Sequence, residues 1–85
     1  MRKLWSDDAW NEYLDWQLSD RKIVKKINEL IKSIERDGVM QGIGKPEPLK
    51  YRKGYSRRIT DEDRLVYDVD NGVLYIYSCE GHYES

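Results

Sequence analysis

The side chains of this sequence that could do chemistry gather in its second half. Glu47 is a carboxylate that can accept a proton, and His82 is the only histidine in the chain. An imidazole has an ordinary pKa of about 6.5, so it can donate a proton near neutral pH. The remaining candidates are three cations that can hold a phosphate and one aromatic ring that can stack on a base: Lys50, Arg58, Arg64 and Tyr83.

Glu47 lies in an unusual setting for a surface acid. Six basic residues fall between Lys45 and Arg58, and Glu47 is the only acid among them. Proline fixes its own φ and holds the preceding residue extended, so Pro46 and Pro48 stiffen the segment around this carboxylate. The pattern indicates an acid held where a polyanion binds. An ordinary solvated loop glutamate is the alternative.

Each of the other candidates also has an ordinary explanation. A lone histidine near a C-terminus is usually a surface residue, and Tyr83 could be an ordinary terminal aromatic. Arg57-Arg58 could be an exposed strand pair. Arg64 could pair with the acids of the 61–63 turn. The chemical interpretation therefore depends on the groups in combination.

In combination, these groups match the requirements of metal-independent RNA cleavage. A carboxylate base removes the proton of a 2′-OH, the oxygen attacks the adjacent phosphorus, and an imidazole acid protonates the leaving 5′-oxygen. Arginine stabilises the charge that gathers on the phosphate oxygens. The sequence thus suggests Glu47 as base, His82 as acid and arginines as the stabilising cations.

Length and composition exclude several other classes. Eighty-five residues, 39% hydrophobic and 36% charged, are typical of one domain, which we expect to span residues 1–85. No apolar run approaches the ~20 residues that cross a bilayer, so we expect no membrane partner. A single cysteine, Cys79, fits a reducing cytoplasm, and we expect a small strand residue there rather than a nucleophile. Metal-ligand and nucleotide-binding motifs are absent, so we expect no cofactor.

The net charge of −1 hides a strongly basic middle of the chain. Residues 21–36 carry six basic and two acidic groups, and residues 44–67 carry seven basic and four acidic groups. Such a concentration of cations can bind phosphate even though the whole chain is nearly neutral.

Two helices are predicted in the first half. Ser6 is an N-cap with acids behind it, and Trp5 and Trp10 stand at staple positions, which predicts a helix from Asp7 to about Gln17. Ser19 is expected to cap the second helix. That helix carries one apolar stripe and ends at Asp37-Gly38. The stripe consists of Ile23, Val24, Ile27, Leu30, Ile31 and Ile34.

A small sheet is predicted around these helices. Lys3–Trp5 is β-prone, 39–48 is a glycine- and proline-rich loop, and Leu49–Tyr51 could form a short strand. Three strands follow, at 55–60, 64–69 and 73–79, and Asn71-Gly72 predicts a type I′ hairpin turn between the last two. The fold class is therefore α+β, with two N-terminal helices packed on a small, mostly antiparallel sheet and the C-terminus near the active face.

The hairpin turn fixes an expected register. Leu65, Tyr67 and Val69 would oppose Ser78, Ile76 and Leu74 on the face that receives the helices. Pairing Ile59 with Leu65 places Arg58 opposite Val66. Arg58 and Arg64 would then share the other, open face with Tyr75 and Tyr77, an arrangement that suits single-stranded nucleic acid.

These residues carry a resemblance to a known family. The segments LWSDDAWNEYLDWQ, KIVKKINELIKSIERDG, GIGKPEPLK, YSRRITDEDRLVY and the terminal HY cover nearly the whole chain. Together they resemble the YoeB/Txe-type toxins of bacterial type II toxin–antitoxin pairs, within the RelE-like group. The resemblance implies the RelE-like fold, cleavage of mRNA in the ribosomal A site, neutralisation by a cognate antitoxin of the YefM/Axe kind, and a homodimer.

The resemblance also implies a role for each candidate. Glu47 of KPEPLK looks like the general base, His82 of the terminal HY like the general acid, and Arg64 of RLVY like the transition-state cation. Arg58 of SRR and Lys50 of PLK look like supporting cations. Tyr83 resembles the terminal tyrosine that assists substrate placement.

Some residues depart from the family pattern. Residues 51–55 look shorter than the usual connection, Tyr55 stands where tryptophan is common, Asp63 replaces a histidine, and two residues follow Tyr83. A non-catalytic toxin or RNA-binding module of the same fold, acting by occupancy, is the alternative function. The basic face of the second helix (Lys22, Lys25, Lys26) could dock on ribosomal RNA or could be a solvated surface.

Overall fold

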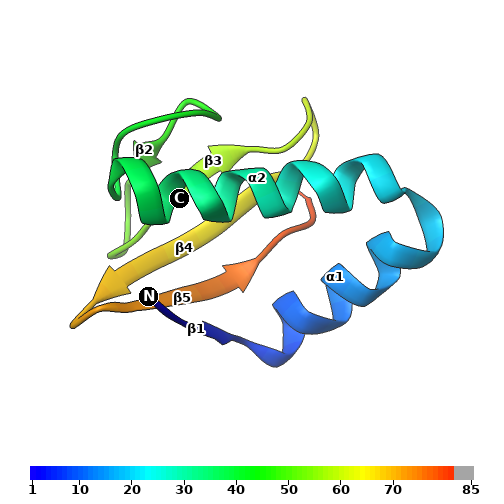
Figure 1. Ribbon diagram of the computed structural model, residues 1–85, viewed down its shortest axis with the longest axis horizontal. Coiled ribbons are helices and arrows are strands. Elements are labelled where there is room, and N and C mark those ends of the chain that lie inside the picture. The colour runs from blue at the N-terminus through cyan, green and yellow to red at the C-terminus, as the bar shows by residue number, and fades with distance from the viewer. Residues whose placement is uncertain (82–85) are drawn as a thin grey trace.

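The computed structural model describes residues 1–81, in which α2 lies across one face of a five-stranded sheet. Figure 1 shows α2 over β3 and β4, with α1 beside the end of β5. The elements are β1 Arg2–Trp5, α1 Asp7–Ser19, α2 Arg21–Asp37, β2 Glu47–Pro48, β3 Tyr55–Arg58, β4 Arg64–Asp70 and β5 Val73–Ser78. The strand order is β1-β5-β4-β3-β2, with β1 parallel to β5 and the other neighbours antiparallel. The predicted fold class is confirmed.

The start of α1 follows the prediction, but the cap of α2 does not. Ser6 Oγ accepts from the N–H of Ala9 at 3.0 Å, and the Trp5 and Trp10 rings meet edge to face at 5.9 Å. Helix α1 continues through Ser19, whose hydroxyl donates to the carbonyl of Asp15 within the helix. Asp20 therefore becomes the cap of α2, and its carboxylate accepts from the N–H of Lys22 at 3.0 Å. Placing this cap at Ser19 was wrong by one residue.

The core lies between α2 and the sheet. Ile27, Leu30, Ile31 and Ile34 of the predicted stripe are buried. They form a single cluster with buried residues of α1 and of the strands: Ala9, Ile59, Leu65, Tyr67, Leu74, Ile76 and Cys79. Four members of the predicted helix-facing set on β4 and β5 are thus buried, whereas Val69 and Ser78 are half-buried.

The β-hairpin turn is confirmed, whereas the predicted short strand is displaced. Asn71 and Gly72 have φ of 49° and 74°, as a type I′ turn requires. Leu49–Tyr51 forms no strand. Glu47 and Pro48 pair instead with Ser56 and Tyr55 at the sheet edge. An edge position tolerates Pro48, because proline lacks the N–H that an interior strand would need.

The predicted β4–β5 register is correct from the hairpin turn to Tyr67 and fails beyond it, where a bulge interrupts the pairing. Tyr67 opposes Ile76 and Val69 opposes Leu74, as expected, but Val66 opposes Ser78. Tyr77 is the extra residue of this bulge, and it shifts the pairing so that Leu65 does not face Ser78. A bulge leaves no mark in an alternating pattern, so the sequence could not place it.

The β3–β4 register also differs from the expected one, by two residues. Arg57 opposes Leu65 and Arg58 opposes Arg64. Ile59 lies beyond the end of β3 and does not pair with Leu65. Because side chains alternate with a period of two, this shift leaves every residue on its expected face. Arg58 and Arg64 therefore do share the sheet face opposite α2, which we call the outer face.

Candidate functional site

The centre of the site is an ion pair between Glu47 and Arg64. Arg64 Nη2 lies 2.9 Å from Glu47 Oε1. The glutamate side chain is 62% exposed, whereas the arginine side chain is 13% exposed. Nη2 itself is buried and forms no aligned hydrogen bond with residues 1–81, so the ion pair is its contact there. The pair joins an accessible carboxylate to a guanidinium that the fold holds in place.

Strand pairing explains why these two residues meet. Arg64 opposes Arg58 on β3, Ser56 lies two residues further along the same face of β3, and Glu47 opposes Ser56. The Arg64 side chain thus reaches diagonally across β3 toward β2, a distance that long side chains span. Ser56 Oγ accepts from Arg64 Nε at 3.0 Å and fixes the direction of the guanidinium. Sequence reasoning missed Ser56, although its parity with Arg58 could have indicated it.

The structure places Arg58 opposite Arg64 and Lys50 two residues after β2. The Arg58 side chain is 47% exposed, and it pairs with Asp61, whose carboxylate lies 3.9 Å away and is 96% exposed. Two arginines directly opposite one another repel unless an anion lies between them. Lys50 lies in the bend directly after β2 and is exposed. Their roles as supporting cations stay predictions.

The chain returns to Arg64 just before residue 82. The N–H of Arg64 donates to the carbonyl of Gly81 at 3.1 Å, and the N–H of Gly81 donates to Asp63 Oδ1 at 2.8 Å. Asp63 Oδ2 also accepts from the Thr60 hydroxyl at 2.7 Å, so this acid ties the 60–63 turn to the C-terminal segment. His82 and Tyr83 lie outside the described residues.

Helix α1 holds the same C-terminal segment from its other side. Trp16 Nε1 donates to the carbonyl of Cys79 at 2.9 Å, and Glu12 Oε1 accepts from its N–H at 2.7 Å. Burial raises the pKa of Glu12, and the Cys79 N–H only partly opposes that change. Burial, with nearby carboxylates, raises the pKa of Cys79 to about 12. Cys79 is therefore a structural thiol, as the sequence indicated.

Arg57 is a correction to the picture of an exposed arginine pair. Its side chain is fully buried on the helix side of the sheet. Nε donates to Tyr67 Oη at 2.9 Å, Nη1 to Ser33 Oγ and the Ile43 carbonyl, both at 3.0 Å, and Nη2 to the carbonyls of Gly38 at 2.8 Å and Gln41 at 2.6 Å. Arg57 thus secures the loop that leads to β2 and has no surface left for phosphate. Neighbouring residues of a strand point to opposite faces of the sheet, so the exposed position of Arg58 could have indicated that Arg57 faces the helix.

The outer face is not open along its whole length. Residues 49–54 fold over it: Lys53 Nζ lies 3.8 Å from Asp68 Oδ2, and the Arg52 guanidinium lies 5.0 Å from the centre of the Tyr77 ring. Val66 is consequently only 1% exposed. The expectation of an open sheet with Tyr77 free for stacking was wrong, because the connection after β2 covers that part of the face.

Known proteins are similar to this chain over nearly its whole length. Residues 5–83 match the model of a family described as the YoeB-like toxin of bacterial type II toxin-antitoxin systems. Toxin YoeB of Escherichia coli strain K12 is 52% identical over 85 residues, covering 98% of this chain and 100% of that protein. The chain belongs to the YoeB-like toxin family.

Solved structures of YoeB toxins also superpose on the whole fold. The structure of a YoeB dimer from Staphylococcus aureus gives a TM-score of 0.92 at 50% identity, with 98% of each chain covered. A heterotetrameric YoeB–YefM toxin–antitoxin complex from the same organism gives 0.91 at 50% identity, again with 98% of each chain covered. The resemblance drawn from the sequence is thereby confirmed.

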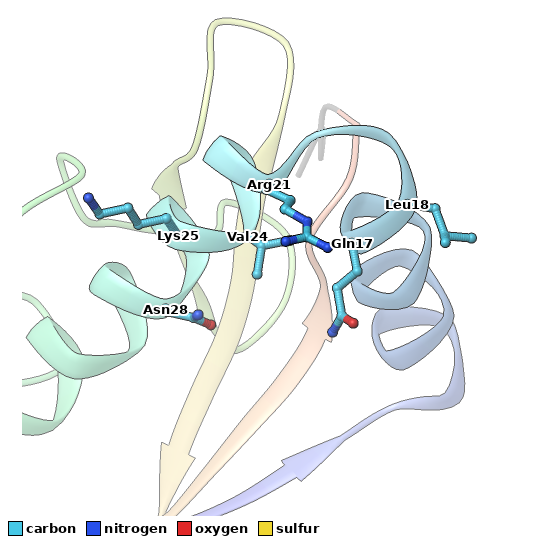
Figure 2. Close-up of a pocket in the computed structure, with 6 residues that line it drawn as sticks. All are labelled: Gln17, Leu18, Arg21, Val24, Lys25 and Asn28. Atoms are coloured by element: carbon cyan, nitrogen blue, oxygen red, sulfur yellow. The ribbon is translucent and has the colours of Figure 1, made fainter.

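A groove of the YoeB-like chain lies away from the candidate centre, between the two helices. Its volume is about 470 Å³. Figure 2 shows the side chains that line it, and those of Leu18 and Lys25 point outward on opposite sides. The lining residues are Gln17, Leu18, Arg21, Val24, Lys25 and Asn28.

Within residues 1–81 no helix is long and apolar enough to cross a membrane. The same residues contain no cluster of three or more His, Cys, Asp or Glu that could hold a metal ion.

Proposed function

We propose that this protein is a ribosome-dependent endoribonuclease that cuts mRNA in the ribosomal A site by metal-independent 2′-OH attack. Glu47 removes the 2′-OH proton, and the oxygen attacks the adjacent phosphorus. Arg64 stabilises the charge on the phosphate oxygens, and His82 protonates the leaving 5′-oxygen. The products carry a 2′,3′-cyclic phosphate and a 5′-hydroxyl.

The Glu47–Arg64 pair is the observation that carries this proposal. A phosphate bound by Arg64 brings its neighbouring 2′-OH toward a carboxylate that lies only 2.9 Å from the guanidinium. Arg64 Nη2 is buried against the exposed Glu47 without an aligned hydrogen bond, so a phosphate oxygen that displaces this carboxylate gains a donor. Ser56 holds the guanidinium beforehand, and preorganised donors are those that stabilise a transition state most.

The other candidate residues have supporting roles in this proposal. Arg58 and Lys50 hold phosphates of the mRNA strand beside the reacting one, and Tyr83 helps to place the substrate. The Arg64–Gly81–Asp63 hydrogen bonds support the role of His82, because they fix the residue that precedes it in the chain.

We also propose the partners of a type II toxin: a cognate antitoxin of the YefM kind, the ribosome, and a second copy of the chain, all in the cytoplasm. Structures of relatives described as a YoeB dimer and a YoeB–YefM complex support the antitoxin and the dimer. Exposed apolar side chains on one side of α1 offer surface for such contacts: Trp10, Leu14 and Leu18.

Cleavage of mRNA on purified ribosomes tests the function. Variants Glu47→Ala, Arg64→Ala and His82→Ala should each lower the single-turnover cleavage rate by about 10²-fold or more, the usual effect of removing an acid, a base or a charge-stabilising donor. Glu29→Ala is the matched control, since Glu29 is an exposed acid on α2 away from the site. Wild-type rates in all three site variants would overturn the assignment.

The chemical ends of the product separate this function from inhibition by occupancy. A nuclease of the proposed kind leaves a 2′,3′-cyclic phosphate, which mass spectrometry of the released fragment detects. Arrest of translation by the wild-type protein with intact mRNA would instead identify a toxin that blocks the A site without cutting.

A further inference from the structure

A second cationic site lies at the end of β3, beside the candidate catalytic centre. It is a cavity of about 230 Å³ whose walls come from α2, from the loop before β2 and from the end of β3. The lining residues are Lys26, Gly44, Lys45, Arg58 and Ile59. In Figure 1 this is the region where α2 passes over β3.

The cavity and the candidate centre meet at Arg58. Arg58, which lines it, pairs directly with Arg64 of β4. The Cα atoms of opposed residues in antiparallel strands are about 4.5–5.5 Å apart. Arg58 is the last residue of β3 and borders both the cavity, on the α2 side of the sheet, and the centre on the outer face, so one RNA strand that passes this end of β3 can contact both.

The charges around the cavity have one sign. Three of its five lining residues are cations and none is an acid. The side chains of Lys26 and Lys45 make no hydrogen bond or ion pair with other residues in 1–81. Within residues 1–81, the Arg58 side chain pairs only with Asp61, which is exposed and lies 3.9 Å away. Three cations that face one exposed carboxylate keep an excess of positive charge, which favours an anion between them.

The cavity is also built by the fold rather than by loose surface chains. The carbonyl of Gly44 accepts from the N–H of Arg58 at 2.7 Å, which fixes the loop to β3. A Cβ at Gly44 would collide with Leu30 of α2, so the loop is also seated firmly against the helix. Lys45, the next residue, has a left-handed backbone conformation with φ of 50°. The walls are therefore in place before any ligand arrives.

We propose that this cavity binds a backbone phosphate of the mRNA strand, next to the phosphate that is cut. The inference rests on the proposed function for the identity of the strand. Contacts to phosphate fix the register of a nucleic acid without reading its bases. The cavity thus sets which linkage lies against Glu47 and Arg64, and it contributes affinity independent of sequence.

Removal of the two lysines tests the site. The probe is a fluorescent single-stranded RNA with a 2′-deoxy nucleotide at the attacking position, so that it is bound but not cut. Lys26→Gln/Lys45→Gln should reduce the steepness of log affinity against log salt by about 0.7 for each phosphate that the protein no longer neutralises. Lys22→Gln/Lys32→Gln removes two exposed lysines of α2 outside the cavity and is the matched control.

Neutral methylphosphonate linkages locate the bound phosphate. Replacing one linkage beside the deoxy nucleotide should weaken binding to the wild-type protein by about tenfold, the effect of removing one charge-assisted hydrogen bond. The same replacement should have a much smaller effect on the cavity double variant, which keeps only Arg58 of the three cations. If no linkage beside the deoxy nucleotide responds, or if the cavity variant and the control show the same decrease in salt dependence, the inference is wrong.

Cleavage measured on ribosomes separates this inference from the proposed function. If wild-type protein cuts mRNA but the cavity variant keeps its full salt dependence and methylphosphonate response, the cavity site is wrong and the nuclease stands. If the wild-type protein cuts nothing while the methylphosphonate effect depends on Lys26 and Lys45, the phosphate site stands and the nuclease is wrong.

Discussion

Replacing Arg57 by methionine should destabilise the protein, whereas the same change at its neighbour Arg58 should not. Methionine is unbranched and apolar and can occupy much of the space of the arginine stem. The Arg57 side chain is fully buried and is hydrogen-bonded on all three nitrogens. Arg58 is exposed and makes one distant ion pair. The two positions thus separate a buried scaffold cation from a surface cation.

The size of the effect follows from the acceptors that lose their donor. Ser33 Oγ still contacts Asp37, and Tyr67 Oη still donates to Val39, so both hydroxyls keep a partner. The carbonyls of Gln41 and Ile43 lose the guanidinium. A buried polar group left unpaired costs about 1–3 kcal/mol. The buried Arg57 guanidinium forms no ion pair with a carboxylate of residues 1–81, so its removal also recovers part of the cost of burying a charge. The expected net loss in the free energy of unfolding is about 2–4 kcal/mol.

Urea unfolding followed by tryptophan fluorescence measures this difference. With an m-value of about 1 kcal/mol/M, Arg57→Met should move the midpoint down by about 2 M or more. Arg58→Met should stay within about 0.5 kcal/mol of wild type, as exposed substitutions do. An Arg57→Met midpoint equal to that of wild type would refute the view that this cation secures the 38–43 loop.

Three further predictions concern the C-terminal segment. Burial raises the pKa of Glu12, so its contribution to stability is full below the unfolded carboxyl pKa and is lost as the pH rises through the folded value. Glu12→Gln should therefore raise the urea midpoint at pH 7 and leave it unchanged below about pH 4, and an equal gain at both would contradict this. Cys79, buried with a pKa raised to about 12, should react with a thiol reagent at pH 8 far more slowly in the folded protein than in urea, and equal rates would mean that it is accessible. Asp63→Ala should lower the single-turnover cleavage rate by about tenfold or more, because it frees Gly81, whereas Asp61→Ala on the exposed turn should not; equal rates would remove Asp63 from the positioning of the site.

Local patterns in the sequence predicted much of the scaffold. The apolar stripe of α2, the Ser6 cap and the Asn71-Gly72 turn depend on neighbouring residues, and all three are confirmed. Alternation predicted which face carries Arg58 and Arg64, even though the expected register was two residues off. A face depends only on parity, whereas a register depends on the length of the 59–63 turn, and that length is a tertiary property.

What the sequence could not predict depends on contacts between distant residues. The Tyr77 bulge, the covering of the outer face by residues 49–54 and the role of Asp63 all arise from segments that meet only in the fold. Arg57 is the clearest case, because arginine is usually exposed and its burial needs acceptors from the 38–43 loop. The roles of all six site residues remain predictions from the sequence, as does the single domain over residues 1–85: Glu47, Lys50, Arg58, Arg64, His82 and Tyr83.

The central claim is that Glu47 and Arg64 act on an RNA 2′-OH and its adjacent phosphate. Cleavage on ribosomes of two mRNAs that differ only in one 2′-oxygen at the attacking nucleotide tests it most directly. The wild-type protein should cut the all-ribose mRNA to a 2′,3′-cyclic phosphate and leave the 2′-deoxy mRNA intact. Cleavage of the deoxy mRNA at the same linkage would contradict the mechanism, because no 2′-oxygen would be present to attack.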